Sequence, residues 1–384
     1  MPLANVLDIL SRLVSFDTES SKSNLGLIRY VEAYLQGLGV DFVTVPNETG
    51  DKAAIFATIG PKIDGGVVLS GHTDVVPVTG QNWSSNPFKI REANGRIYGR
   101  GTCDMKGFGA IALGLIPEML RADLGRPIHI LLSYDEETTC LGPMGVIARF
   151  SKDLPTPGVV IVGEPTSLEV ADAQKSIATY RTIVTGLEAH SAKPDLGANA
   201  IPFACELVSG LYTFQNELAR LGDPTGRFDP GMSTISVGII GGGTARNILA
   251  RECSFLWEFR GLPNTPQRLA LDHFNHVADD MLSRLRQNAP DANIITEIEV
   301  EIPGLSPDQG SRAETLALKL ARRNSTIAVP FATEAGRFQL AGVPTVVCGP
   351  GSINQAHQPD EYIEMSEIEA GIAFIRRLID ELVG

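Results

Sequence analysis

The sequence predicts an α/β protein whose mostly parallel central sheet is interrupted by a smaller inserted α+β domain. In the first half of the chain, and again near its end, short continuous apolar runs alternate with stretches of helical periodicity. Strands that are buried on both faces of a parallel sheet produce such runs. In the middle of the chain the pattern changes to strand-like stretches grouped around two longer helical ones.

The α/β part contains helices and buried strands in alternation. Helical periodicity covers about residues 3–15, 24–38, 108–120, 144–150, 312–323 and 366–382. The apolar runs are Ala53–Ile59, Val67–Ser70, Ile128–Ser133, Val159–Val162 and Pro344–Cys348. Because the runs occur on both sides of the central region, residues 1–177 and 303–384 are predicted to form one discontinuous domain.

The region 178–302 has its own order of elements. Its strand-like stretches are Ile177–Thr185, Thr234–Ile240, Cys253–Arg260 and Ile294–Glu301, and its helical stretches are Ala198–Leu221 and Pro266–Gln287. The resulting order, βαββαβ, is that of a ferredoxin-like motif. It predicts an antiparallel sheet with two helices on one face.

Composition excludes some classes of protein. The 384 residues carry a formal net charge of −13, which disfavours nucleic acid as a partner because phosphate binding needs a basic surface. No window approaches 18 apolar residues, and the first residues lack a basic segment followed by an apolar stretch, so no membrane span or signal peptide is expected. The five widely spaced cysteines form no CxxC pair and indicate free thiols in a reducing cytoplasm.

Polar residues follow the predicted parallel strands. The segment Ser70–Pro77 comes at the end of one run and contains His72, a natural zinc ligand, and Asp74, which could accept the other ring N–H. Alternatively, this His-x-Asp pair is structural. His129 matches no motif and is expected in the core.

Two further segments supply carboxylates. Glycines flank Asp104 in Gly99–Gly107 and allow close approach of the backbone, although Asp104 could instead cap a helix, and Cys103 is a conceivable soft ligand. Three adjacent carboxylates at 135–137 follow another strand, and a metal ion would offset their repulsion. One of these could bind metal while its neighbour acts as a general base. A solvated acidic turn is the alternative.

The last two candidates also follow strands. Glu164 comes after Val159–Val162, and His357 lies in the Gly/Pro-rich loop after Pro344–Cys348. With His72, Asp104 and Glu137 they form a set of two imidazoles and three carboxylates at one edge of the sheet. Such a set suits two divalent ions that share one carboxylate.

These segments resemble the zinc aminopeptidase-like clan. Within it they are similar to the family that contains acetylornithine deacetylase, succinyl-diaminopimelate desuccinylase, carboxypeptidase G and aminoacylase. The motifs are SGHTDVVP, GRGTCDMKG, DEE, GEPT and AHQPDEY, and the likeness covers essentially the whole chain. It implies a zinc-peptidase-like three-layer catalytic domain, with 178–302 as a ferredoxin-like lid and homodimer contact.

The resemblance also implies roles for the candidate metal ligands. Asp104 would bridge two Zn²⁺ ions, for which Co²⁺ could substitute. His72 and Glu164 would complete one site, and Glu137 and His357 the other.

The resemblance assigns other residues to catalysis. Glu136 would be the general base, and Asp74 would orient His72. His190 of the lid would reach the partner subunit's active site, although a surface turn is the alternative for His190.

The substrate is expected to be a small N-acyl amino acid. Asn247 and Arg260 match positions that hold a substrate carboxylate, or they are surface residues at strand ends. The segment Thr333–Gly336 (TEAG) resembles most the corresponding segment of acetylornithine deacetylases. This resemblance implies hydrolysis of N-acetyl-L-ornithine in arginine biosynthesis. Glu334 is then a candidate partner for the cationic side chain, although it could support a turn or bond a neighbouring loop. Succinyl-diaminopimelate, other acyl amino acids and C-terminal peptide bonds are the alternative substrates.

Overall fold

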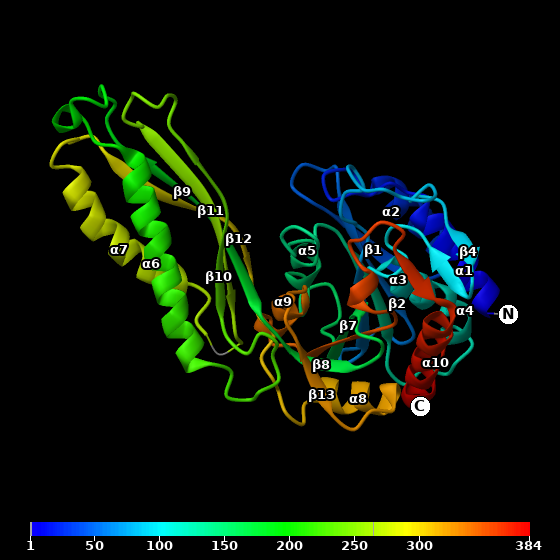
Figure 1. Cartoon of the computed structure of the whole chain (residues 1–384). Coiled ribbons are helices and arrows are strands. Elements are labelled where there is room, and N and C mark those ends of the chain that lie inside the picture. Colours follow the sequence, from blue (N-terminus) through cyan, green and yellow to red (C-terminus); the bar gives the residue numbers. More distant parts are fainter. Residues whose placement is uncertain (1, 264) are drawn as a thin grey trace. The chain divides into compact units, whose positions relative to one another are not determined.

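The computed structural model describes residues 2–263 and 265–384 and divides into two compact units, each visible in Figure 1. The larger unit comprises the chain up to Ala173 together with Pro307–Ala328 and Thr333–Gly384. The smaller unit comprises Gln174–Ser306 and Val329–Ala332, so it contains the whole of the predicted insertion 178–302.

Within the described residues, the larger unit is built on an eight-stranded mixed sheet. The strands, in spatial order, are β1 (Asp41–Pro46), β2 (Ala53–Ile59), β6 (Ile128–Ser133), β3 (Val67–His72), β7 (Val159–Pro165), β14 (Thr345–Gly349), β8 (Val170–Gln174) and β13 (Thr326–Val329). The central strands β6, β3, β7 and β14 are parallel. The predicted parallel centre of an α/β fold is therefore confirmed.

The outer strands depart from the parallel arrangement. β2 pairs with both β1 and β6 in antiparallel fashion, although its apolar run suggested a parallel strand. The reason is the connection from β2 to β3: it is short and contains no helix, whereas a parallel strand needs a long crossover. β8 is also antiparallel to β14.

Helices cover the sheet and create the main core. They are α1 (Pro2–Val14), α2 (Leu25–Gly37), α3 (Lys106–Gly114), α4 (Ile116–Met119), α5 (Met144–Ile147), α8 (Arg312–Ala321), α9 (Ala335–Leu340) and α10 (Met365–Leu382). Buried residues of α1, α2, α3, α8 and α10 form one cluster with alternate residues of the central strands. A small second sheet joins β15 (Tyr362–Glu364), β5 (Arg96–Tyr98) and β4 (Arg91–Ala93).

The smaller unit has the predicted order of elements. Its strands β9 (Ser176–Thr185), β10 (Thr234–Gly242), β11 (Glu252–Gly261) and β12 (Asn293–Ile302) form an antiparallel sheet in the order β10-β11-β9-β12. The helices α6 (Ala200–Leu221) and α7 (Leu269–Leu285) lie side by side against it (Figure 1). Every second residue of β9 is buried, as expected for a sheet with one covered face.

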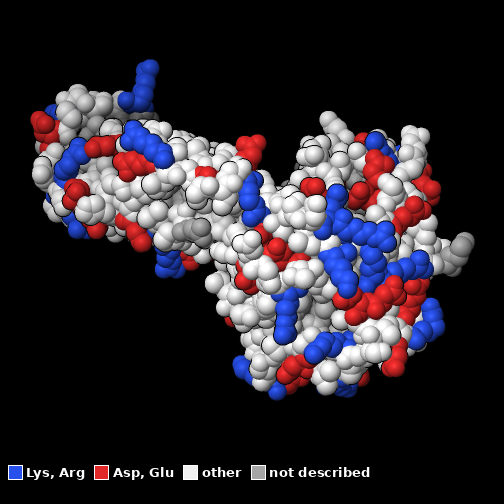
Figure 2. Space-filling view, turned by 90° about the horizontal axis from the view of Figure 1, so that it is seen from below, with Lys and Arg blue, Asp and Glu red and all other residues white. Residues whose placement is uncertain are grey.

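The surface carries charges of both signs. Figure 2 shows groups of Lys and Arg next to Asp and Glu on the face in view, and more of them on the larger unit than on the smaller one. Exposed pairs such as Arg376–Glu118, at 2.8 Å, contribute little to stability, so these charges chiefly keep the surface hydrated. No helix in 2–263 or 265–384 combines the length and apolar composition that crossing a bilayer requires.

His129 lies in the core, on β6, and is fully buried. Its Nδ1 lies 3.0 Å from Thr58 Oγ1, and its ring stacks on Phe56 with the centroids 4.8 Å apart. The other ring nitrogen, Nε2, has no hydrogen-bond partner among the described residues. Burial lowers the pKa of His129 to about 4.

This buried imidazole makes the folded protein sensitive to acid. The unfolded chain binds the His129 proton below about pH 6.5, whereas the folded chain does so only below about pH 4. Stability should therefore fall as the pH drops through this window, by up to about 3 kcal/mol at its lower end. Urea unfolding in the presence of chelator at pH 7 and pH 5 measures it. His129→Phe, which retains the stacking on Phe56, should lose less stability, and equal losses would contradict the assignment.

Candidate active site

Four parallel strands deliver the predicted site residues to one edge of the sheet. His72 is the last residue of β3, Glu136 and Glu137 follow β6, and Glu164 lies near the end of β7. His357 lies in the loop after β14. The carboxyl ends of parallel strands are where open α/β sheets place their sites. The register pairs His72 with Ser133 of β6, which brings the acidic segment beside the imidazole.

Asp104 lies between the two histidines. Its Oδ1 is 3.1 Å from His72 Nε2, and its Oδ2 is 3.2 Å from His357 Nε2. One carboxylate thus faces both imidazoles with different oxygens, which is the geometry of a bridging ligand. The loop that precedes α3 places Asp104 here, and the side chain is buried.

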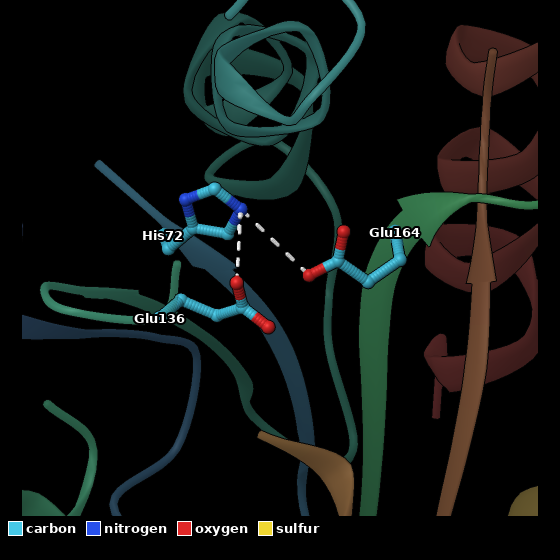
Figure 3. Close-up of side chains that lie close together, drawn as sticks. All are labelled: His72, Glu136 and Glu164. Atoms are coloured by element: carbon cyan, nitrogen blue, oxygen red, sulfur yellow. Dashed lines mark ion pairs between the residues drawn. The ribbon is translucent and has the colours of Figure 1, made fainter. Parts of the chain in front are cut away.

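The remaining carboxylates surround this pair. Glu136 and Glu164 each place an oxygen 3.8 Å from His72 Nε2, and both carboxylates approach this nitrogen from the same side (Figure 3). Glu137 Oε2 lies 2.9 Å from His357 Nε2. The donor atoms of His72, Glu136 and Glu164 lie within 4.8 Å of one another, as do those of His72, Asp104 and Glu137.

The site concentrates buried negative charge. Burial, with the neighbouring Glu136, raises the pKa of Glu164 well above its usual value, and burial raises that of Glu137 to about 7. Hydrogen bonds to Asp104 and Glu137 raise the pKa of His357 to about 10. Among the described residues, Glu164 Oε1 is buried without a hydrogen-bond partner. Divalent cations would satisfy this oxygen and offset the repulsion, so the donor set fits metal ions.

Asp74 fixes the segment that carries the acidic residues. Its carboxylate accepts hydrogen bonds from the Ser20 hydroxyl at 2.7 Å and from the backbone N–H groups of Glu136 at 3.2 Å and Glu137 at 3.3 Å. His72 Nδ1 lies 2.9 Å from the backbone oxygen of Asp74 and 3.5 Å from its carboxylate. The shorter contact of the imidazole is thus with the backbone oxygen of Asp74, and the carboxylate that was expected to orient the ring lies farther from it.

Glu334 is fully buried beside β3 and β6. Its two oxygens accept hydrogen bonds from the hydroxyls of Ser70, at 2.5 Å, and Ser133, at 2.7 Å. These serines precede His72 and Glu136 on β3 and β6. The arrangement favours the hydrogen-bonding alternative for Glu334 over contact with a substrate side chain.

Sequence reasoning missed a residue beside Glu136. The thiol of Cys140 donates to the Glu136 carboxylate at 3.5 Å and to its backbone oxygen at 3.2 Å. Cys140 lies four residues after Glu136 in the sequence, but this spacing alone does not predict a contact. The turn that follows β6 brings the two side chains together.

Within the smaller unit, the candidates His190 and Asn247 lie apart from Arg260. The loops of His190 and Asn247 are joined, since the Ser191 N–H donates to the Asn247 backbone oxygen at 3.0 Å and His190 bridges to Ile248. Both loops lie beyond the end of the sheet where β11 starts, at Glu252. Arg260 lies near the other end of β11 and pairs with Glu258 at 3.0 Å.

The length of β11 sets the distance between these groups. The nine residues from Glu252 to Arg260 make eight steps of about 3.3 Å each and span about 26 Å. Asn247 and Arg260 of one chain therefore lie toward opposite ends of β11.

Known proteins match this chain over almost its whole length. Residues 68–381 match the peptidase family M20/M25/M40. Acetylornithine deacetylase of Photorhabdus laumondii is 35% identical over 95% of this chain and 92% of its own length. Among solved structures, aminopeptidase PepT from Bacillus cereus has a TM-score of 0.78 at 19% identity and covers 100% of this chain and 99% of its own.

A second solved structure agrees with the first on the fold. The M20 family metallo-carboxypeptidase Sso-CP2 from Sulfolobus solfataricus has a TM-score of 0.76 at 18% identity and covers 98% of this chain and 99% of its own. The fold, the buried His, Asp and Glu cluster and the family match all agree. The chain therefore belongs to the M20/M25/M40 peptidase family and is a metallohydrolase similar to acetylornithine deacetylases.

Proposed function

We propose that the protein hydrolyses N-acyl amino acids in the cytoplasm and that N-acetyl-L-ornithine, which yields L-ornithine and acetate, is its main substrate. The observation that carries the hydrolytic part is the Asp104 carboxylate between two histidines, at 3.1 and 3.2 Å. The substrate is inferred from relatives named acetylornithine deacetylase at about 35% identity.

Two divalent ions, Zn²⁺ or Co²⁺, fit the donor set. Asp104 would bridge them, with His72 and Glu164 at one ion and Glu137 and His357 at the other. When bound, such ions polarise the acyl carbonyl and lower the pKa of water towards neutrality.

Glu136 is the base in this proposal. Its backbone is held by Asp74, and its carboxylate lies 3.8 Å from His72 Nε2, beside the place where water and the acyl group would meet. Burial raises the pKa of Glu136 well above its usual value, which favours a group that takes a proton from water and returns it to the leaving amine.

A homodimer would assemble the rest of the site. His190 and Asn247 of one chain would meet Arg260 of the other, with His190 donating to the developing oxyanion and Arg260 pairing with the substrate α-carboxylate. Edge strand β10 exposes Ile239 and Ile240, which could be covered by such a contact.

Complementation between two inactive variants tests the use of His190 in trans. His190→Ala should lower kcat about 10²–10³-fold, more than it changes KM, because an oxyanion donor acts in the transition state. Mixing His190→Ala with Glu136→Gln should restore activity, since one site of the mixed dimer combines an intact Glu136 with an intact His190. Each variant incubated alone is the control. No recovery despite proven subunit exchange would mean that His190 acts in its own chain or not at all.

A substrate panel tests the function itself. Acetylornithine, acetylcitrulline, acetylmethionine and succinyl-diaminopimelate are assayed in parallel with zinc and with cobalt. We expect kcat/KM to be highest for acetylornithine, by about 10-fold or more, and to fall when the α-carboxylate is amidated. A preference for succinyl-diaminopimelate, or for a C-terminal peptide bond, would replace the proposed substrate without changing the reaction class.

The same substrate panel tests the role of Glu334. If Glu334→Gln loses activity equally on acetylornithine and acetylmethionine, the residue supports β3 and β6, as its hydrogen bonds suggest. A selective loss on acetylornithine would make it a partner of the cationic side chain.

A further inference from the structure

Glu361 is a buried carboxylate held by four donors. Its Oε1 accepts the backbone N–H groups of Cys103, at 2.9 Å, and Asp104, at 3.1 Å. Its Oε2 accepts the N–H of Gly101 at 3.0 Å and Nη1 of Arg100 at 2.8 Å. The side chains of Arg100 and Glu361 are each only 1% exposed.

These bonds connect two segments that are far apart in the sequence. The donors belong to the loop that ends in Asp104, and Glu361 lies four residues after His357. A second connection runs in parallel: Arg100 Nη2 donates to Gln81 Oε1 at 2.5 Å, and Gln81 Nε2 donates to the backbone oxygen of His357 at 2.8 Å. Arg100 and Glu361 therefore tie the loop of Asp104 to the loop of His357.

We propose that Glu361, with Arg100, is a positioning residue that sets the distance between Asp104 and His357 and thereby the affinity for the ion between them. This inference rests on the proposed dinuclear site. Glu361 touches neither the substrate nor the ions in this proposal, and acts only through the two loops.

The effect should differ between the two metal sites. His72 and Glu164 lie on β3 and β7, whose positions are fixed by the ladder of the central sheet. Asp104 and His357 lie on loops, and the described contacts of Glu361 and Arg100 join those loops directly. Loss of the Glu361 carboxylate should therefore weaken the ion at His357 far more than the ion at His72. A general loss of stability would weaken both alike.

The fitting variant is Glu361→Gln. Its amide would set an N–H₂ group against backbone N–H groups or against the Arg100 guanidinium, so at least one accepted bond is lost. Stepwise Co²⁺ titration of the metal-free protein, followed by visible absorption, measures the two affinities. A His357→Ala variant identifies the step that belongs to the His357 ion. We expect that step to weaken by about 10–100-fold in Glu361→Gln, the usual effect of altering a residue that supports a ligand.

The pair Arg96–Glu364 offers a matched control. It joins β5 and β15, the strands next to Arg100 and Glu361, at 2.8 Å, but the two side chains are 39% and 38% exposed. Its contacts among the described residues include neither the loop of Asp104 nor the loop of His357. Glu364→Gln should leave both titration steps unchanged.

Two outcomes would overturn the proposal. One is a Glu361→Gln protein whose two steps match those of the wild type. The other is an equal weakening of both steps together with a lower unfolding temperature. If Glu361→Gln does not fold, Glu361→Asp and Arg100→Lys replace it, and unchanged affinities in both would overturn the proposal.

The wild-type stoichiometry separates this inference from the proposed function. If the wild type binds a single ion, the dinuclear site is wrong whatever Glu361 does. Glu361 is then judged on that ion, and an unchanged affinity in Glu361→Gln would refute its positioning role.

Discussion

Glu136→Gln is expected to lower kcat about 10²–10⁴-fold while the protein keeps both ions. The amide has nearly the shape of the carboxylate but cannot take a proton from water. The ions should remain because Glu137, rather than Glu136, makes the 2.9 Å contact with His357. Activity assays and elemental analysis of the same preparation measure both quantities.

The neighbouring residue supplies the matched comparison. Glu137→Gln should lose an ion as well as activity, since its carboxylate is a proposed ligand. If Glu136→Gln turns over at a near-normal rate, Glu136 has no role in proton transfer. If it loses an ion, Glu136 is a ligand, in line with the cluster of His72, Glu136 and Glu164 within 4.8 Å.

Asp104→Ala is expected to abolish activity and to reduce the bound metal below two ions per chain. Asp104 is the only proposed ligand that faces both His72 and His357, so its loss should weaken both sites. The effect should exceed the roughly 10–100-fold loss that follows from altering a supporting residue. Chelation of the wild type should produce the same inactive state, and added zinc or cobalt should restore the wild type only.

Elemental analysis decides whether Asp104 bridges. A wild type that saturates at one ion, or an Asp104→Ala protein that retains two, would refute the bridging role. The paired controls are His72→Ala and His357→Ala, each of which should weaken mainly one of the two ions. Equal behaviour of all three variants would show that the ligands cannot be divided between two sites in the proposed way.

The sequence was sufficient for the parts of the fold that repeat a strong pattern. The parallel centre of the sheet and the βαββαβ unit follow from long apolar runs and from two long helices. The direction of β2 was predicted wrongly, because an apolar run indicates burial on both faces but does not determine the direction of the strand. β1 and β13 lie at the two edges of the sheet and are mostly only partly buried, and β8 contains Asp172 and Gln174, so none of the three forms a long continuous apolar run.

The candidate site was predictable to a similar degree. His72, Asp104, Glu137, Glu164 and His357 follow strand ends or glycine loops, and the structure brings them together. Glu334 was proposed as a partner of the substrate side chain or as a structural residue, and Glu361 was given no role. Their contacts depend on hydroxyls and backbone N–H groups from distant segments, which no local pattern encodes.

The spacing of Arg260 and Asn247 was also implied by the sequence. Both residue types can bind a carboxylate, and the resemblance to the family suggested that both hold the substrate. Their places along β11 were already implied by the predicted strand Cys253–Arg260, which starts after Asn247 and ends at Arg260. The length of an extended strand between two residues is by itself enough to keep their side chains apart.

If the proposed homodimer completes each active site, the separation along β11 would make the catalytic rate depend on the concentration of the chain. If each active site needs His190 and Asn247 from one chain and Arg260 from the other, a monomer is inactive. At chain concentrations below the dissociation constant of the homodimer, the rate would grow with the square of the chain concentration. At higher concentrations the rate would be proportional to the chain concentration. A cell with few copies would have almost no activity. An excess of a copy that lacks both Glu136 and His190 would inactivate the wild-type chains by pairing with them, because neither site of such a mixed dimer would be complete.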